Sequence, residues 1–178
     1  GHREFMNTAA LVLKQRPEVT FAIVGGDVTP KGVFLDELRQ WVAERGLGKQ
    51  ILFLGWRRDI PEVTSCFDLA VQASRYVEGL GRSLLEGMAV GLASVATRTG
   101  GFCEVVEDGV TGLLTPVGDS QAMSEAILQL LADPAKRQAM GAAGRRRLER
   151  YFDAKVQIQE FKQLFLDVLQ RPYRRWYP

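Results

Sequence analysis

The sequence predicts an α/β domain in which helices flank a parallel sheet. Two observations predict this class: short apolar runs of strand length recur along the chain, and helical apolar periodicity fills most of the segments between them. The expected strands are 20–26, 51–55, 69–73, 93–97 and 112–116. Because strands alternate with helices, a parallel sheet covered on both faces is the architecture to expect.

Amphipathic helices are expected on both sides of the first of these strands. Phe5 and Val12 share a helix face before it, and Phe34 and Leu38 share one after it. A helix at the start is unusual, because doubly wound domains open with a strand that lies centrally in the sheet. We therefore expect either that the domain's first strand lies upstream of Gly1 or that the topology differs.

The last third of the chain is expected to be helical. Asp119 and Asp133 stand where helix caps are needed, and Pro134 suits the first position of the second of these helices. A final helix carries an apolar stripe formed by Ile158, Phe161, Phe165, Val168 and Leu169. We predict one domain over residues 1–150, followed by a C-terminal helix and tail over 151–178.

Composition excludes several classes of function. Lys+Arg 23 against Asp+Glu 21 gives a net charge of +2, too balanced to indicate a nucleic-acid partner. His2 is the only histidine, which argues against Ser-His or Cys-His nucleophiles and histidine-rich metal sites. Cys66 and Cys103 form no CxxC motif, so we expect reduced thiols in a cytoplasmic protein. No apolar run reaches the roughly 20 residues that span a bilayer, and no signal peptide is recognisable.

Two basic segments bear on partners. Arg145, Arg146 and Arg147 are expected to form the solvated face of a helix rather than a nucleic-acid patch. The tail 171–178 mixes basic and aromatic residues, which suits an interface or a membrane surface. Peripheral contact with the cytoplasmic face of a membrane is therefore an expectation for this protein.

The segment 74–97 carries the strongest functional signal. It leaves one expected strand, passes through a glycine-rich loop and enters a helix that begins near Arg82. Gly79 and Gly81 permit unusual backbone conformations and close approach of a ligand. The first N–H groups of the helix lack partners within it and attract anions, and the hydroxyl of Ser83 adds a donor. A diphosphate is the ligand that these groups favour.

Two carboxylates flank this loop with the spacing E-x7-E. Glu78 would lie at the carboxyl end of the sheet, and Glu86 shares a helix face with Arg82 and Ser83. Carboxylates beside an anion site can accept hydrogen bonds from sugar hydroxyls. We expect a ribose on one side of the diphosphate and a second sugar on the other. The alternatives are a surface ion pair of Glu86 with Arg82 and a plain loop charge at Glu78.

Two further loops follow strands at the same edge of the sheet. Trp56 and Arg57 could receive a base and its ribose; the alternative is a solvated turn in which Asp59 caps a short helix. Gly100 and Gly101 predict a tight turn followed by one helical turn.

These segments resemble the C-terminal, donor-binding half of retaining GT-B glycosyltransferases of the glycosyl transferase group 1 type. The matching stretches are FAIVGGD, ILFLGWRRDIPEVTSCFDLAVQAS, EGLGRSLLEGMAVGLASVAT and TGGFCEVVEDGVTGLLTPVGD. They follow the family's order over roughly residues 2–150. The resemblance implies a Rossmann-like domain, one half of a GT-B fold. It also implies that the first strand and two diphosphate-binding cations lie upstream of Gly1, which would leave a gap in the middle of the sheet.

The resemblance assigns roles to individual positions. Glu78 matches the glutamate beside the transferred sugar and is the expected catalytic residue, and Glu86 matches the glutamate that holds the ribose hydroxyls. The other donor-binding positions that it implies are Gly79, Leu80, Gly81, Arg82 and Ser83 around the phosphates and sugar, Trp56 and Arg57 at the base, and Gly25 and Gly26 lining the cleft.

The implied activity is transfer of a sugar from a nucleotide-sugar donor to an acceptor with retention of configuration. No metal or other cofactor is expected. The partner would be an acceptor-binding N-terminal domain, toward which the last helix returns, and the chain alone would be inactive. Two alternatives stay open: a stand-alone nucleotide-binding or regulatory module without transferase activity, and a nucleotide-sugar epimerase, which would need further acid/base residues.

Overall fold

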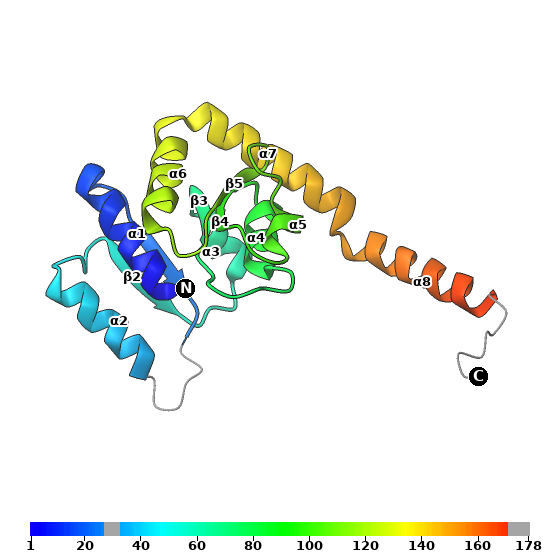
Figure 1. The fold of residues 1–178 in the computed structure, drawn as a ribbon, viewed down its shortest axis with the longest axis horizontal. Helices are drawn as coiled ribbons and strands as arrows, with labels where there is room; N and C mark the ends of the chain where they lie inside the picture. Colours follow the sequence, from blue (N-terminus) through cyan, green and yellow to red (C-terminus); the bar gives the residue numbers. More distant parts are fainter. Residues whose placement is uncertain (27–32, 171–178) are drawn as a thin grey trace.

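The computed structural model describes residues 1–26 and 33–170, and it is a layered α/β structure with strands in the middle and helices around them (Figure 1). The described strands are β1 (Phe21–Val24), β2 (Ile51–Gly55), β3 (Leu69–Gln72), β4 (Ala93–Thr97) and β5 (Gly112–Thr115). The helices are α1 (His2–Gln15), α2 (Val33–Glu44), α3 (Ile60–Ser65), α4 (Arg82–Ala89), α5 (Phe102–Val105), α6 (Ser120–Ala132), α7 (Pro134–Tyr151) and α8 (Ala154–Gln170).

The described strands form two parallel sheets rather than one. β1 pairs with β2 in the first sheet, and β4 lies between β3 and β5 in the second. The gap in the middle of the sheet that the resemblance implies is therefore present, between the β1–β2 sheet and the β3–β4–β5 sheet. Gly1, at the start of α1, lies against the carboxyl end of β3, because a Cβ added to it would be 1.8 Å from the carbonyl oxygen of Ala73.

Helix α1 holds the two sheets together. Its side chains Met6 and Val12 are buried in one apolar cluster with Phe21 of β1 and Val95 of β4. It is also tied to α6, because the hydroxyl of Ser120 donates a hydrogen bond of 3.2 Å to the main-chain oxygen of Glu4 in α1. The helix that apolar periodicity predicted at the start of the chain is thus present, and it packs at the centre of the fold.

The C-terminal helices begin where the cap residues predicted. Asp119 accepts a hydrogen bond of 2.9 Å from the amide of Ala122 at the start of α6, and Asp133 accepts one of 2.9 Å from the amide of Lys136. Pro134 is the first residue of α7. These contacts satisfy amides that a helix leaves unpaired at its first turn.

A second apolar cluster lies beneath the loops that follow β3 and β4, and α7 closes it. Its fully buried members are Leu84, Met88, Ala96, Phe102, Val105 and Val106. The solvated arginine face that the sequence predicts is present at Arg145 and Arg146, which are exposed, whereas Arg147 is half-buried. Arg145 donates to the carbonyl of Ala89 at the end of α4, and Arg147 donates to that of Val105, 3.0 Å away, at the end of α5. Carbonyls in the last turn of a helix have no hydrogen-bond donor within that helix. The guanidinium groups of Arg145 and Arg147 provide the missing donors.

Helix α8 extends away from the rest of the chain (Figure 1). It has no buried residue, and its apolar stripe is exposed, with Phe165 at 65% and Leu169 at 80% of their accessible surface. The tail 171–178 lies outside the described residues. None of the helices within 1–26 and 33–170 combines the length and apolar character required to cross a bilayer.

Candidate functional site

The glycine-rich loop after β3 leads into α4 as the sequence predicted. Helix α4 begins at Arg82, and Gly81 before it has φ 69° and ψ 57°, a left-handed conformation that suits glycine. A Cβ at Gly81 would also lie 2.6 Å from the ring of Phe102, which is fully buried. The loop therefore needs glycine at this position for both its backbone angle and its packing. Arg82 and Ser83, the first residues of α4, are exposed.

Both predicted carboxylates are on exposed residues that flank this loop. Glu78 lies in the loop, and its carboxylate accepts a hydrogen bond of 3.0 Å from the hydroxyl of Ser74. Glu86 lies on α4, and no ion pair joins it to Arg82 in the part of the chain that the structure describes. The alternative of a surface ion pair is therefore not supported, and neither residue is buried in the apolar interior.

Gln72 is a site residue that the sequence reasoning missed. It is the last residue of β3, and its side-chain amide donates to the hydroxyl oxygen of Ser83 at the start of α4. Because that oxygen accepts from Gln72, the hydroxyl hydrogen of Ser83 remains available to an anion at the helix start. A polar residue at the end of an otherwise apolar strand was the available signal.

The predicted residues after β1 and β2 meet one another. The amide of Gly25 donates 2.9 Å to the carbonyl of Gly55, and a Cβ added to Gly26 would lie 2.1 Å from Nε1 of Trp56. The indole thus lies against the glycine backbone, yet Trp56 keeps 74% of its surface exposed. This leaves an aromatic surface free for a planar ligand.

Arg57 is paired with Asp59 in the same loop. Its Nε donates 2.9 Å to the carboxylate, and hydrogen bonding to Asp59 raises the pKa of the guanidinium while hydrogen bonding to Arg57 lowers the pKa of the carboxyl. Helix α3 begins after Asp59, as the alternative interpretation expected. The side chain of Asp59 nevertheless makes no cap hydrogen bond, because it bonds Arg57 instead.

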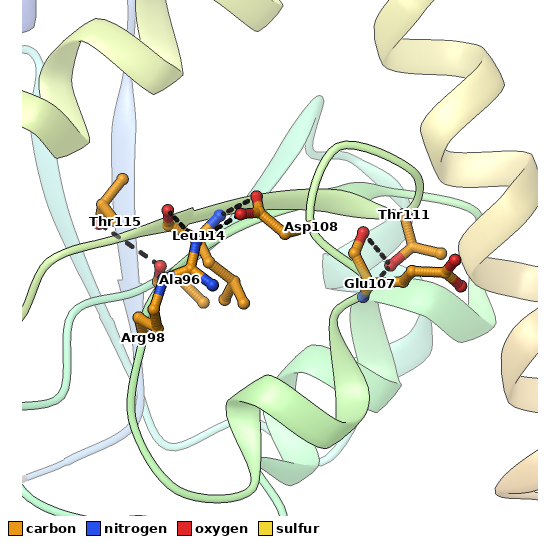
Figure 2. A network of polar contacts seen from close by, with 7 residues as sticks. All are labelled: Ala96, Arg98, Glu107, Asp108, Thr111, Leu114 and Thr115. Atoms are coloured by element: carbon orange, nitrogen blue, oxygen red, sulfur yellow. Dashed lines mark hydrogen bonds and ion pairs between the residues drawn. The ribbon is translucent and has the colours of Figure 1, made fainter.

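A polar network fixes the loop between α5 and β5 (Figure 2). Asp108 accepts a hydrogen bond of 2.9 Å from the amide of Leu114 and a second from the guanidinium of Arg98, and Thr111 accepts one of 2.9 Å from the amide of Glu107. Burial raises the pKa of Asp108, but the hydrogen bonds from Leu114 and Arg98 outweigh it and hold this pKa below its usual value. The guanidinium of Arg98 is therefore engaged in an ion pair with Asp108.

The described residues contain no cluster of three or more His, Cys, Asp or Glu side chains placed to hold a metal ion. The groups that the strands bring together are instead a glycine loop, a helix start and exposed carboxylates at the carboxyl ends of parallel strands. Ligands of open α/β sheets bind at this end. The fold therefore belongs to the Rossmann-like α/β class, with the candidate site at the ligand-binding end of its strands.

The family model for glycosyl transferases group 1 matches residues 1–147, and the chain belongs to this family. It is 35% identical over 150 residues to the lipopolysaccharide core biosynthesis mannosyltransferase LpsB of Rhizobium meliloti, which covers 83% of this chain and 42% of that protein. It is 38% identical over 138 residues to the mannosyltransferase LpcC of Rhizobium leguminosarum, covering 77% of this chain and 39% of that one. The chain thus spans less than half the length of these relatives.

Solved structures show the same fold. HepE of Anabaena, in complex with UDP, superposes with a TM-score of 0.84 at 30% identity, over 90% of this chain and 44% of that one. The C-terminal domain of a group 1 glycosyl transferase, LpcC of Francisella tularensis, superposes with a TM-score of 0.78 at 30% identity, over 86% of this chain and 80% of that one. The predicted parallel α/β fold, one half of a GT-B fold, is therefore confirmed.

Proposed function

We propose that this chain is the donor-binding half of a retaining glycosyltransferase that moves a sugar from a nucleotide-sugar to an acceptor. One observation carries the proposal: two exposed glutamates, Glu78 and Glu86, flank a left-handed glycine and a helix start at the carboxyl end of β3. HepE, which is similar over 90% of this chain, has been crystallised with UDP-glucose. A nucleotide-sugar is therefore the ligand that the proposal assigns to this site.

The proposed donor lies along the carboxyl ends of the strands. Its diphosphate accepts hydrogen bonds from the first amides of α4 and from the hydroxyl of Ser83, where the helix dipole favours negative charge. Glu86 accepts hydrogen bonds from the ribose hydroxyls, and the base lies toward the exposed indole of Trp56. Glu78 lies beside the transferred sugar, and its carboxylate is oriented by Ser74.

The proposed chemistry is the departure of the nucleoside diphosphate from the anomeric carbon. Helix amides and cations stabilise the charge that develops on the diphosphate, so the proposal requires no metal ion. Glu78 orients the donor sugar or stabilises positive charge at the anomeric carbon, and it is not proposed as a covalent nucleophile. The stand-alone nucleotide-binding module differs in predicting nucleotide binding without any transfer.

The aligned stretches cover only 42% and 39% of the two mannosyltransferase relatives, so we propose that an acceptor-binding N-terminal domain completes the enzyme. That domain would receive the exposed apolar stripe of α8. A strand from the same longer protein would lie between β1 and β3 and join the two sheets, which share one apolar cluster with α1. Peripheral contact with the cytoplasmic face of a membrane, which the basic and aromatic tail 171–178 suits, is also part of the proposal.

The proposal is tested by thermal unfolding of the 178-residue chain with UDP-, GDP- and ADP-sugars. A ligand at 100 times its Kd stabilises the folded state by about 2.7 kcal/mol, enough to raise Tm by several degrees. We expect one nucleotide series to raise Tm, and Glu86→Ala to reduce that rise. If no nucleotide-sugar shifts the Tm of either this chain or the full-length protein, the donor-binding role is wrong. If the longer protein binds nucleotides but transfers no sugar, the regulatory module replaces it.

A further inference from the structure

We infer that Gly100 and Gly101 are positioning residues for the loop that carries Glu78. The sequence predicted only a turn at these glycines, and neither belongs to the proposed donor-binding set. The structure shows that the turn after β4 lies directly beneath the loop after β3. The functional part of this inference rests on the proposed function, whereas the physical coupling of the two loops does not.

The two glycines contact the backbone of the Glu78 loop with no space for a side chain. The amide of Gly101 donates a hydrogen bond of 2.8 Å to the carbonyl oxygen of Glu78. A Cβ at Gly101 would lie 1.8 Å from the carbonyl oxygen of Gly79, and a Cβ at Gly100 would lie 2.4 Å from that of Glu78. Both obstacles are backbone atoms, so no side-chain rotation can relieve the overlap.

Both ends of the Glu78 loop also contact residues at the end of β4 and the start of α5. At its start, the hydroxyl of Thr97 donates 2.8 Å to the carbonyl oxygen of Ser74, whose own hydroxyl bonds Glu78. At its end, Gly81 packs against the ring of Phe102. Thr97 and Phe102 are buried, at 2% and 0% of their accessible surface. The turn is therefore a rigid base on which residues 74–81 rest.

A side chain at residue 101 must displace the loop, since its base is buried and cannot retreat. The displaced atoms are the backbone of Glu78 and Gly79, which the proposed function places at the sugar and diphosphate. Glu86 lies more than a turn along α4, and none of the hydrogen bonds among the described residues joins it to either glycine. A substitution at residue 101 should therefore weaken contacts to the sugar-diphosphate end of a donor and spare those to the nucleoside.

The test compares two ligands on the Gly101→Ala chain by calorimetry. One is the nucleotide-sugar that most stabilises the unaltered chain among the UDP-, GDP- and ADP-sugars, and the other is its nucleoside monophosphate. We expect the nucleotide-sugar to lose affinity by about tenfold or more, because small displacements are costly at such sites. The monophosphate should change by less than about twofold, as expected for a distant site. Equal losses for both ligands, or no loss for either, would overturn the inference.

Gly46→Ala is the control for destabilisation alone, because Gly46 has a positive φ of 66°, unlike Gly101 at φ −61°, and has open space around its Cβ position. It should lower stability and leave both affinities unchanged. Thr97→Val provides a milder variant if Gly101→Ala fails to fold, since it removes only the hydrogen bond to Ser74. It should lower the nucleotide-sugar affinity and spare the monophosphate affinity. Equal losses of affinity for both ligands, or no loss for either, would again overturn the inference.

Hydrogen exchange separates this inference from the proposed function. Amides within 74–81 should exchange faster in Gly101→Ala than in Gly46→Ala, with no ligand present. Unchanged exchange there would overturn the coupling between the two loops. Faster exchange in a chain that binds no nucleotide-sugar would uphold the coupling and refute the donor-binding role.

Discussion

The hydroxyl of Ser74 donates a hydrogen bond of 3.0 Å to a carboxylate oxygen of Glu78. The carbonyl of the same serine accepts from the buried hydroxyl of Thr97. An exposed carboxylate is therefore oriented from within the fold, which lowers the entropy lost when it meets a ligand. Its second oxygen makes no hydrogen bond to the described residues and is available to a sugar.

Glu78→Gln in the full-length enzyme should lower kcat more than it raises KM. The amide keeps the size of the side chain but loses its negative charge, so charge stabilisation in the transition state is lost. A loss of about 10²–10³ in kcat is the scale of removing one electrostatic stabiliser. Steady-state kinetics with the donor varied would measure it. Glu62→Gln, on α3, is the control, and an equal effect on both parameters would contradict the assigned role.

Glu86→Ala should weaken binding of a nucleoside diphosphate. Hydrogen bonds to charged groups are each worth about 1.5–3 kcal/mol, so the Kd should rise roughly 10- to 150-fold for one such bond. Titration calorimetry on the 178-residue chain measures the change directly. Glu160→Ala, an exposed glutamate on α8, should leave the Kd unchanged. Unaltered affinity in the Glu86 variant would count against the ribose role.

Asp108 should contribute stability that depends on pH. Its pKa is lower in the folded state than the value of about 3.9 of a free aspartate, so its contribution is complete above that value and is lost as pH falls through the folded pKa. Asp108→Asn should therefore be less stable than the unaltered chain at pH 7, and the difference should shrink below about pH 4. Urea unfolding at several pH values tests this. Asp36→Asn, on the surface of α2, should give a difference smaller than that of Asp108→Asn at pH 7.

Gly141→Ala should destabilise the domain, although alanine normally favours a helix. A Cβ at Gly141 in α7 would lie 1.9 Å from the carbonyl oxygen of Gly91, so the helix would have to move away from β4. Overpacking of this kind costs about 1–3 kcal/mol. Gly48→Ala, where the Cβ meets open space, should change the free energy of unfolding by less than about 0.5 kcal/mol. Equal stability of the two variants in urea would contradict this packing.

The apolar stripe of α8 should contribute little to the stability of this chain. Phe161 and Phe165 are 58% and 65% exposed, and α8 has no buried residue. Replacing both by glutamine should alter the free energy of unfolding by less than about 0.5 kcal/mol for each substitution. In the full-length protein the same double variant should be destabilising if the stripe packs against a second domain. Denaturant unfolding of both forms distinguishes the two results.

Much of the fold could be predicted because its signals are local. The five strands are continuous apolar runs, and the caps at Asp119 and Asp133 are short-range patterns that the structure reproduces. The start of α4 after the glycine loop could also be predicted from the sequence, because Gly81 takes the left-handed conformation before its first turn. The roles assigned to Glu78 and Glu86 stay predictions, as does the role of the remaining donor-binding residues.

The sequence alone determined the class of the domain and the order of its elements, since periodicity and caps are properties of neighbouring residues. The family was indicated by the resemblance of its motifs to those of a known family. Only the tertiary structure showed that Gln72 bonds Ser83, that Arg145 and Arg147 serve carbonyls of other helices, and that Gly101 lies beneath Glu78. Each of these contacts joins separate elements of the fold. Whether a side chain is solvated or paired across such a distance depends on packing, and packing is decided by the whole chain at once.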